Sequence, residues 1–177
     1  MPENKHHLSP RLHPHRLDDE AYRRVGSPVF VTLATAHRRS FLTTPGVPDR
    51  FVEAMDWCAA PRGTCVVCYC VMPDHVHLIA CSSREDEDLC SFLTAVKKRS
   101  WFLFRDAGVE PPYWERSYWD RHARACEDLN DQVAYVLNQP VRAGLCTRAE
   151  DWPYSESRGF YVPDAGGHKP ERGPASP

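Results

Sequence analysis

The sequence predicts an α+β fold, a ferredoxin-like antiparallel sheet in the order β-α-β-β-α-β with an additional C-terminal helix. Three observations predict it. Short runs rich in β-branched and aromatic residues alternate with longer segments whose apolar residues recur at helical spacing. The dipeptide Pro73-Asp74 separates two apolar runs by a tight turn, so these runs form a hairpin. The length of 177 residues suits one domain with a single core.

The predicted strands and helices follow one another between residues 28 and 139. Strands are expected over 28–37, 64–73, 75–82 and 113–123. Helices are expected over 48–61, 86–104 and 128–139, and a proline ends the first and the last of them. The second helix has an apolar stripe made of Leu89, Phe92, Leu93, Val96, Ser100 and Leu103.

Two terminal segments flank a domain of residues 28–161. Residues 1–27 are rich in Pro, His and Arg and predict a flexible arm, whereas 162–177 predict a disordered tail. There is no long apolar run, and the N-terminus lacks the apolar segment of a secretory signal. We therefore expect a cytoplasmic protein without a membrane span. In that setting the eight cysteines are expected to be reduced.

The Cys65-Val-Val-Cys68 spacing is typical of half a metal-binding knuckle, but it lies in a predicted strand. The two cysteines would then face opposite sides of that strand, and no second pair with this spacing completes a zinc site. We therefore interpret both as small core thiols.

The segment VMPDHVHLIA, residues 71–80, places two histidines one residue apart in an apolar run. Its alternation is that of a strand, so His75 and His77 share a face with Cβ atoms roughly 6–7 Å apart. Two imidazoles at that spacing can bind one metal ion. The alternative is a structural pair whose ring nitrogens make ordinary hydrogen bonds.

The last predicted helix carries a phenol and an amide. Tyr135 and Gln139 are four residues apart and therefore share one helix face. The opposing side is apolar and is expected to dock on the sheet; it comprises Leu129, Val133, Val136 and Val141. Tertiary packing could turn Tyr135 and Gln139 toward the histidine pair.

These segments together resemble a known family. VMPDHVHLIA is similar to the His-hydrophobic-His motif of HUH endonucleases. SYWDRHARACEDLNDQVAYVLNQPVRAGL followed by DWPYSESRGF resembles the C-terminal signature of REP-associated tyrosine transposases, which are relatives of the single-tyrosine insertion-sequence transposases. The resemblance covers residues 28–161, and its specificity comes from the ordered set of motifs.

The resemblance implies a single-stranded DNA transposase or endonuclease. His75, His77 and Gln139 would bind a divalent ion, Mg²⁺ or Mn²⁺, although many REP-associated members have Asn at the third position. Tyr135 would attack a phosphodiester, leaving a 5′-phosphotyrosine bond and a free 3′-OH. A tyrosine phenol ordinarily has a pKa of about 10, so a nearby cation is needed to favour the phenolate. Two alternatives are a non-catalytic hairpin-binding protein and a metal-dependent hydrolase that uses only the histidine pair.

The resemblance also implies single-stranded or hairpin DNA as the partner of a monomer or a homodimer. The formal net charge of −2 does not indicate such a partner, so the distribution of charge carries the argument. The candidate phosphate contacts are Lys97, Lys98, Arg99, Arg116, Arg121 and Arg124. Neighbouring aromatic residues, Tyr113, Trp114, Tyr118 and Trp119, could stack on bases. The competing interpretation is that the basic helix is a solvated face and that the aromatic residues belong to the core.

Overall fold

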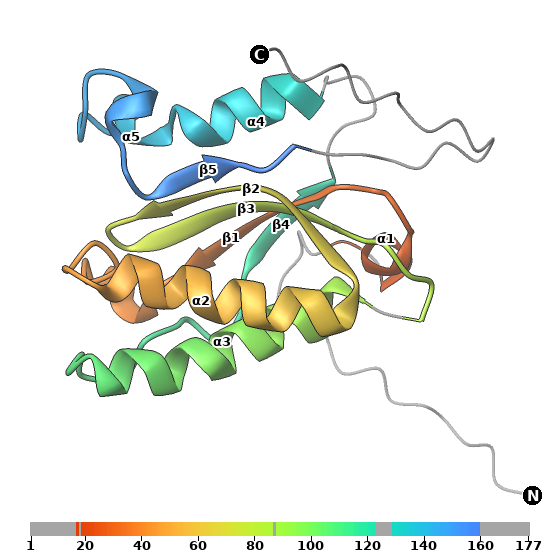
Figure 1. Cartoon of the computed structure of the whole chain (residues 1–177), viewed down its shortest axis with the longest axis horizontal. Coiled ribbons are helices and arrows are strands. Elements are labelled where there is room, and N and C mark those ends of the chain that lie inside the picture. Colours follow the sequence, from red (N-terminus) through yellow and green to blue (C-terminus); the bar gives the residue numbers. More distant parts are fainter. Residues whose placement is uncertain (1–16, 18, 87, 123–128, 160–177) are drawn as a thin grey trace, which may run out of the picture.

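The structure is a computed structural model that describes residue 17 and residues 19–86, 88–122 and 129–159. Its centre is an antiparallel sheet with the strand order β4-β1-β3-β2-β5 (Figure 1). The strands are β1 (Val29–Ala34), β2 (Thr64–Met72), β3 (His75–Ser82), β4 (Trp119–His122) and β5 (Ser155–Ser157). The order β4-β1-β3-β2 is that of a ferredoxin-like sheet, which confirms the predicted fold class. β5 extends the sheet beyond β2 and was not predicted.

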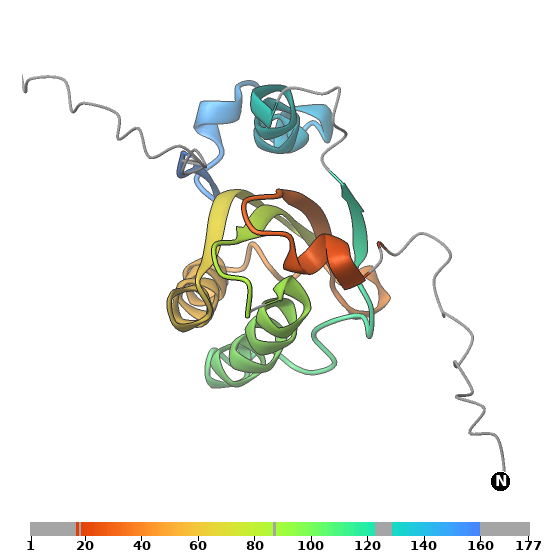
Figure 2. The ribbon, with the colours of Figure 1, turned by 90° about the vertical axis from the view of Figure 1, so that its right-hand side faces the viewer.

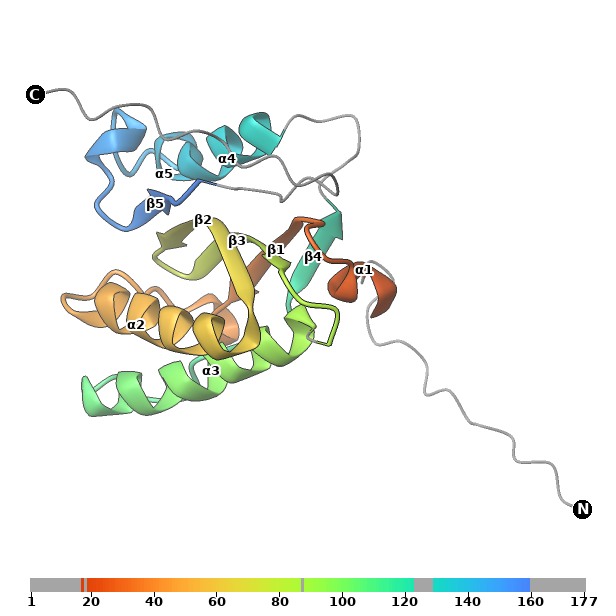
Figure 3. The ribbon, with the colours of Figure 1, turned by 45° about the vertical axis from the view of Figure 1, so that its right-hand side comes forward.

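Helices cover both faces of the sheet. They are α1 (Asp19–Arg23), α2 (Val47–Ala59), α3 (Leu89–Asp106), α4 (Leu129–Leu137) and α5 (Gln139–Arg142). The end-on view shows α2 and α3 on one face and α4 and α5 over the other (Figure 2). The short α1 lies at one end of the sheet, beside the start of α3 (Figure 3). None of the described helices combines the length and the apolar character that crossing a membrane requires.

Each face of the sheet has its own apolar core, because side chains alternate along every strand. The core toward α2 and α3 is the larger and includes Leu33, Leu78 and Phe92. The smaller core, toward α4, comprises Phe30, Val67, Cys68, Cys70, Met72, Ile79 and Val136. His75 and His77 alternate with the inward side chains of the larger core, so they lie on the α4 face.

The strand predicted over 113–123 is much shorter in the structure. Only Trp119–His122 pair with β1 as a strand. Tyr113 is buried in the larger core, and Trp114 Nε1 donates a hydrogen bond to Ser100 Oγ at 2.9 Å. The aromatic residues at the start of this segment therefore pack against α3, and their pairing beside β1 is limited to an isolated bridge between Trp114 and Thr35.

The helix predicted over 128–139 is divided in two. α4 ends at Leu137, and α5 begins at Gln139 with Pro140 in its first turn. Proline suits the first turn of a helix because the N–H group that it lacks has no partner there. Pro140 therefore lies in the first turn of a helix, whereas we predicted that it ends one.

The N-terminal segment predicted as an arm over 1–27 includes ordered structure near its end. α1 lies within it, and Tyr22 is 1% exposed in the larger core. Residues 1–16 of the predicted arm and the predicted tail over 162–177 lie outside the described residues. Burial of Tyr22 explains why the chain is held against the domain before β1 begins.

Cys65 and Cys68 share one face of β2, which corrects the expectation that they face opposite sides. The register shifts between Val66 and Cys68, so Cys65 is opposite Cys81 and Cys68 is opposite Ile79. Such a bulge puts one extra residue into a strand and changes the face of those beyond it. Burial raises the pKa of the Cys68 thiol to about 12, in keeping with a core thiol.

Candidate active site

His75 and His77 lie on the face of β3 that is turned toward α4, as the alternation of the sequence predicts. Their Nε2 atoms are 3.0 Å apart, and the two ring planes cross at 85°. Both residues are half-buried, and the His75 side chain is 15% exposed. Two ring nitrogens therefore converge on one point that solvent can reach.

The other nitrogen of each ring has a separate partner. His75 Nδ1 lies 2.6 Å from Asp74 Oδ1, and His77 Nδ1 lies 3.0 Å from Thr32 Oγ1. Thr32 is directly opposite His77 in the pairing of β1 with β3. When Nδ1 donates its hydrogen to these oxygens, the Nε2 atom of each ring carries the lone pair. Two such lone pairs at this separation repel each other unless a proton or a cation lies between them.

The converging nitrogens fit a divalent cation. With bonds of about 2.1 Å, neighbouring ligand atoms of an octahedral ion lie about 3.0 Å apart, and the two Nε2 atoms have this separation. The imidazoles are neutral ligands, so they leave the charge of the ion intact and positions open for other oxygen donors. Within the described residues, no group of three or more His, Cys, Asp and Glu side chains is placed to hold a metal. A third ligand from the described residues would therefore be of another type, such as an amide.

Tyr135 lies over the same face of the sheet as the histidines. The next residue, Val136, is fully buried in the smaller core and fixes α4 on the sheet. The Phe30 ring neighbours both groups, with its centroid 6.2 Å from that of Tyr135 and 5.5 Å from that of His77. Tyr135 itself is 38% exposed, and Arg142 Cζ lies 5.0 Å from its ring centroid. The phenol is therefore accessible, and Tyr135 and His77 have the Phe30 ring as a common neighbour.

Gln139 begins α5 and turns back toward α4. Its Nε2 donates a hydrogen bond to the Tyr135 carbonyl oxygen at 3.0 Å. Among the described residues, neither His75 nor His77 is a hydrogen-bond partner of Gln139. The structure thus brings the two histidines together and puts Tyr135 close by, while the amide as a third ligand stays a prediction.

The basic residues Lys97, Lys98 and Arg99 lie on α3, across the sheet from the histidine pair (Figure 2). Lys97 Nζ donates hydrogen bonds to the carbonyl oxygens of Glu115 and Ser117, both at 2.8 Å. Burial lowers the pKa of this amine to about 8. Lys97 therefore holds the loop before β4 against α3, a role that differs from the predicted phosphate contact.

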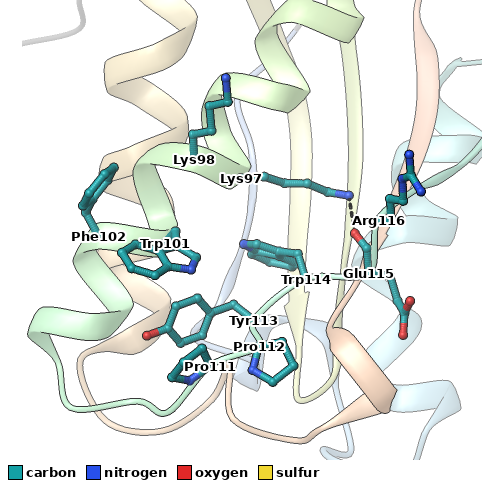
Figure 4. A pocket seen from close by; sticks show the side chains of 10 residues that line it. All are labelled: Lys97, Lys98, Trp101, Phe102, Pro111, Pro112, Tyr113, Trp114, Glu115 and Arg116. Atoms are coloured by element: carbon teal, nitrogen blue, oxygen red, sulfur yellow. Dashed lines mark hydrogen bonds between the residues drawn. The ribbon is translucent and has the colours of Figure 1, made fainter.

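Lys98 and Arg116 are exposed beside an apolar pocket of about 600 Å³ on the α3 side of the molecule (Figure 4). The apolar walls of the pocket are Trp101, Phe102, Pro111, Pro112, Tyr113 and Trp114. The pocket thus gathers three predicted phosphate contacts, Lys97, Lys98 and Arg116, and two predicted stacking residues on the side of the sheet opposite to the histidines. Any DNA contact made here would be to a part of the nucleic acid away from the reacting phosphate.

The remaining predicted phosphate contacts have different positions. Arg99 stacks over Trp57, with Cζ 4.9 Å from the ring centroid, and its Nη2 lies 3.8 Å from Glu53 Oε1. Arg121 belongs to β4, where only its backbone is described, and Arg124 lies outside the described residues. The six predicted cations therefore do not form a ring around the histidine pair.

Thr32 was not selected from the sequence, and Asp74 was interpreted as part of the hairpin turn. Thr32 is the polar residue in the apolar run VFVTLA of β1, so its position was the available signal. Only the pairing register shows that it faces His77.

The family model described as "Transposase IS200 like" matches residues 28–138. The chain belongs to this family. The matched region includes His75, His77 and Tyr135 and ends one residue before Gln139. Family membership thus covers the strand-borne histidines and the helix-borne tyrosine of this IS200-like transposase.

Several known proteins are similar to this IS200-like transposase. The REP-associated tyrosine transposase of Escherichia coli K12 is 29% identical over 102 residues, which cover 55% of this chain and 59% of the relative. A Haemophilus influenzae protein provisionally given the same name is 25% identical over 103 residues, covering 50% of this chain and 56% of its own. The chain therefore spans little more than half the length of these two relatives.

A solved structure gives the corresponding three-dimensional likeness. It is a REP-associated tyrosine transposase bound to a REP hairpin, with a TM-score of 0.63 and 25% sequence identity. The alignment covers 75% of this chain and 77% of that one. The likeness supports the antiparallel sheet with helices on both faces that the IS200-like transposase shows.

Proposed function

We propose that this IS200-like transposase cleaves and rejoins single-stranded DNA beside hairpins, with Tyr135 as the nucleophile. The observation that carries the proposal is the 3.0 Å convergence of the His75 and His77 Nε2 atoms on the face that α4 covers. A purely structural pair has no need to direct two ring nitrogens at each other when Asp74 and Thr32 already occupy the outer nitrogens. Two ligands of one cation, by contrast, must direct their ring nitrogens at a common point.

The residues around the histidine pair suit the binding of a scissile phosphate. A divalent ion held by His75, His77 and Gln139 would supply positive charge beside the scissile phosphate. Asp74 and Thr32 hold the imidazoles in the orientation in which the two Nε2 atoms face each other. Because the proposed ligands are all neutral, they do not cancel the attraction for phosphate oxygens.

The proposed step exchanges one phosphodiester bond for another. The Tyr135 Oη atom attacks phosphorus while the bond from phosphorus to the 3′ oxygen breaks. The phenol loses its proton to solvent, the departing 3′ oxygen gains one, and the 5′ phosphate stays on the tyrosine. A 3′-OH then attacks the phosphotyrosine in the reverse sense, which joins strands and restores the phenol. Because Tyr135 is 38% exposed, DNA can approach it without unfolding of α4.

A covalent adduct tests this proposal. The chain is mixed with Mn²⁺ or Mg²⁺ and hairpin oligonucleotides that carry single-stranded extensions, taken from the flanks of its gene. We expect a protein–DNA band that survives boiling in detergent and disappears in Tyr135→Phe. Tyr154→Phe is the matched control, because it removes a phenolic oxygen from a residue packed against Trp152 and away from the histidines. No adduct with the wild-type chain on any of these substrates would contradict the proposal.

The same assay separates the two alternatives. Metal-dependent cleavage that persists in Tyr135→Phe would indicate a hydrolase that uses only the histidine pair. Hairpin binding with no cleavage in any metal would indicate a non-catalytic DNA-binding protein. A hairpin is the appropriate probe because the solved relative with a TM-score of 0.63 is bound to one.

Mixing two inactive variants tests whether a monomer or a homodimer forms the site. His77→Ala keeps the tyrosine, and Tyr135→Phe keeps the histidines. If α4 of one copy serves the histidines of another, the mixture regains adduct formation. If each chain uses its own tyrosine, the mixture stays inactive at every ratio.

A further inference from the structure

We infer that Arg38 is a phosphate-binding residue of the active site, which holds the DNA strand beside the histidine pair. This inference rests on the proposed function and names a residue that neither the sequence motifs nor the family likeness selects. It starts from the turn after β1, a 3₁₀ turn of Ala36–Arg38. That turn lies next to the hairpin that carries His75, because Thr35 N donates a hydrogen bond to the Asp74 carbonyl oxygen.

The backbone of this turn is strained. His37 and Arg38 have φ values of 56° and 55°, in the left-handed region that residues with a Cβ atom rarely adopt. Surrounding contacts hold them there. The buried Thr35 hydroxyl lies 2.9 Å from the carbonyl oxygens of Arg39 and Asp74. His37 N donates a hydrogen bond to Glu115 Oε1 at 2.9 Å.

The strained turn places the Arg38 side chain against Asp74, the carboxylate that contacts His75. The Arg38 Nε atom lies 2.9 Å from Asp74 Oδ2, while the other carboxylate oxygen lies 2.6 Å from His75 Nδ1. One carboxylate therefore joins the guanidinium to the first imidazole. A DNA strand whose reacting phosphate lies at the Nε2 atoms could therefore place a neighbouring phosphate beside this guanidinium, on the Asp74 side of His75.

Arg38 has hydrogen-bond donors to spare. A guanidinium carries five N–H donors in one plane, and Asp74 uses the Nε side. Within the described residues, the Nη atoms of Arg38 have no hydrogen-bond partner, and the side chain is 58% exposed. Two outward Nη groups in a fixed plane match the geometry of two phosphate oxygens.

A simple ion pair does not account for this arrangement. An exposed ion pair contributes little stability in water, whereas two consecutive left-handed residues cost stability. Backbone strain of this kind persists mainly where it positions a functional group. Asp74 also has its own partner in His75, so its charge alone does not require Arg38.

Binding measurements on modified DNA test the inference without relying on catalysis. Tyr135→Phe protein, which cannot form the adduct, is titrated in EDTA with the hairpin oligonucleotides defined above. Each phosphate of the single-stranded extension is replaced in turn by an uncharged methylphosphonate. At one position we expect binding to weaken on the order of tenfold, because a charge-assisted hydrogen-bonded pair is lost.

Adding Arg38→Ala should remove that positional penalty, because the cation that felt the charge is gone. Arg38→Lys should retain a reduced penalty, since it keeps the charge but loses the planar fork. Arg84→Ala is the matched control. Arg84 is an exposed arginine that forms a two-bond pair with Asp86 beyond the far end of β3, so its removal should leave the penalty in place.

The outcomes are distinct. An unchanged penalty profile in Arg38→Ala overturns the inference, even if the wild-type chain forms the tyrosine adduct. If Arg38→Ala fails to fold, as judged by circular dichroism, an unchanged profile in Arg38→Lys overturns it equally. If the wild-type chain binds none of the oligonucleotides, the proposed function and this inference fail together. Loss of the penalty at one phosphate supports Arg38, whether or not that phosphate is the one cleaved.

Discussion

The face of the sheet under α2 and α3 and the face under α4 differ in what their side chains do. The first buries large aromatic and aliphatic residues, among them Phe51, Phe92 and Phe104, each at 0% exposure. The second holds a smaller cluster with sulfur atoms from Cys68 and Met72, and the histidine pair extends along the same surface.

The two faces of the sheet therefore contribute differently, one mainly to stability and the other to the candidate site. Stability scales with the apolar area removed from water, and the larger core supplies most of that area. The α4 face can therefore carry polar side chains that add little to an apolar core. These are the imidazoles of His75 and His77, the exposed phenol of Tyr135 and the buried amide of Gln132. Successive side chains of every strand point to opposite faces, so one residue contributes to the larger core and its neighbour to the α4 face. Substitutions at such neighbours can test the division directly.

The largest expected effect comes from neighbouring residues of β3. His77→Ala should lower adduct formation by at least about a hundredfold, because loss of a mere partner of a metal ligand already costs 10–100-fold. Its stability should change little. Val76→Ala, on the opposite face and fully buried, should lower the free energy of unfolding by about 1–3 kcal/mol and keep activity. Urea unfolding and the adduct assay measure both effects, and equal loss of activity in the two variants would contradict the division.

A second comparison uses apolar residues on the two faces. Phe92→Ala, in the larger core, should lower the free energy of unfolding by about 3–5 kcal/mol. Val136→Ala should cost less stability, about 1–3 kcal/mol, but should reduce the rate of adduct formation because Val136 fixes the helix that carries Tyr135. Single-turnover rates on folded protein separate the two. A normal rate in Val136→Ala would show that α4 needs no such anchor.

A gain of stability is expected at Gln132, on the inner side of α4. This residue is 2% exposed, and neither its Oε1 nor its Nε2 has a hydrogen-bond partner among the described residues. Gln132→Met keeps the side-chain length and removes the unsatisfied amide, so the free energy of unfolding should rise by about 1–2 kcal/mol. Thermal denaturation checks this, with Asn138→Met, at an exposed position between α4 and α5, as the control. A less stable Gln132→Met would mean that the amide has a partner in solution.

An effect that depends on pH is expected from Lys97, on α3. Burial lowers the pKa of its amine from 10.5 to about 8. Between these values the unfolded chain binds more protons than the folded one, so stability rises with pH across that window. Below pH 8 the folded state carries the buried charge at full cost, and above pH 10.5 both states are neutral. The urea midpoint of the wild type should rise relative to that of Lys97→Met as the pH increases across this window. A difference between the two midpoints that does not change with pH would show that the amine is not desolvated.

Local patterns were enough to predict most of the fold. The alternation of VMPDHVHLIA placed both histidines on one face, and the Pro73-Asp74 turn placed the two central strands side by side. These features depend on neighbours in the chain, so sequence spacing determines them. β5 was missed because its three residues, Ser155–Ser157, have no apolar alternation and form a strand only by pairing with β2.

The candidate site was only partly predictable, because several of its contacts join distant segments. Thr32 and His77 are 45 residues apart, and only the strand register brings them together. The placement of Lys97 across the sheet from the histidines depends on which face α3 covers, which its sequence does not encode locally. Pro140 was misread because proline can follow one helix and open the next with the same local preference.

The route of the chain around α4 has a mechanical consequence. In sequence, α4 follows β4 at one margin of the sheet, and α5 leads to β5 at the opposite margin. The segment that carries Tyr135 is thereby joined in sequence to an edge strand at each of its ends. The attachment after α5 depends on a pairing of only three residues between β5 and β2, so it is the shortest pairing in the sheet that bears on the position of α4.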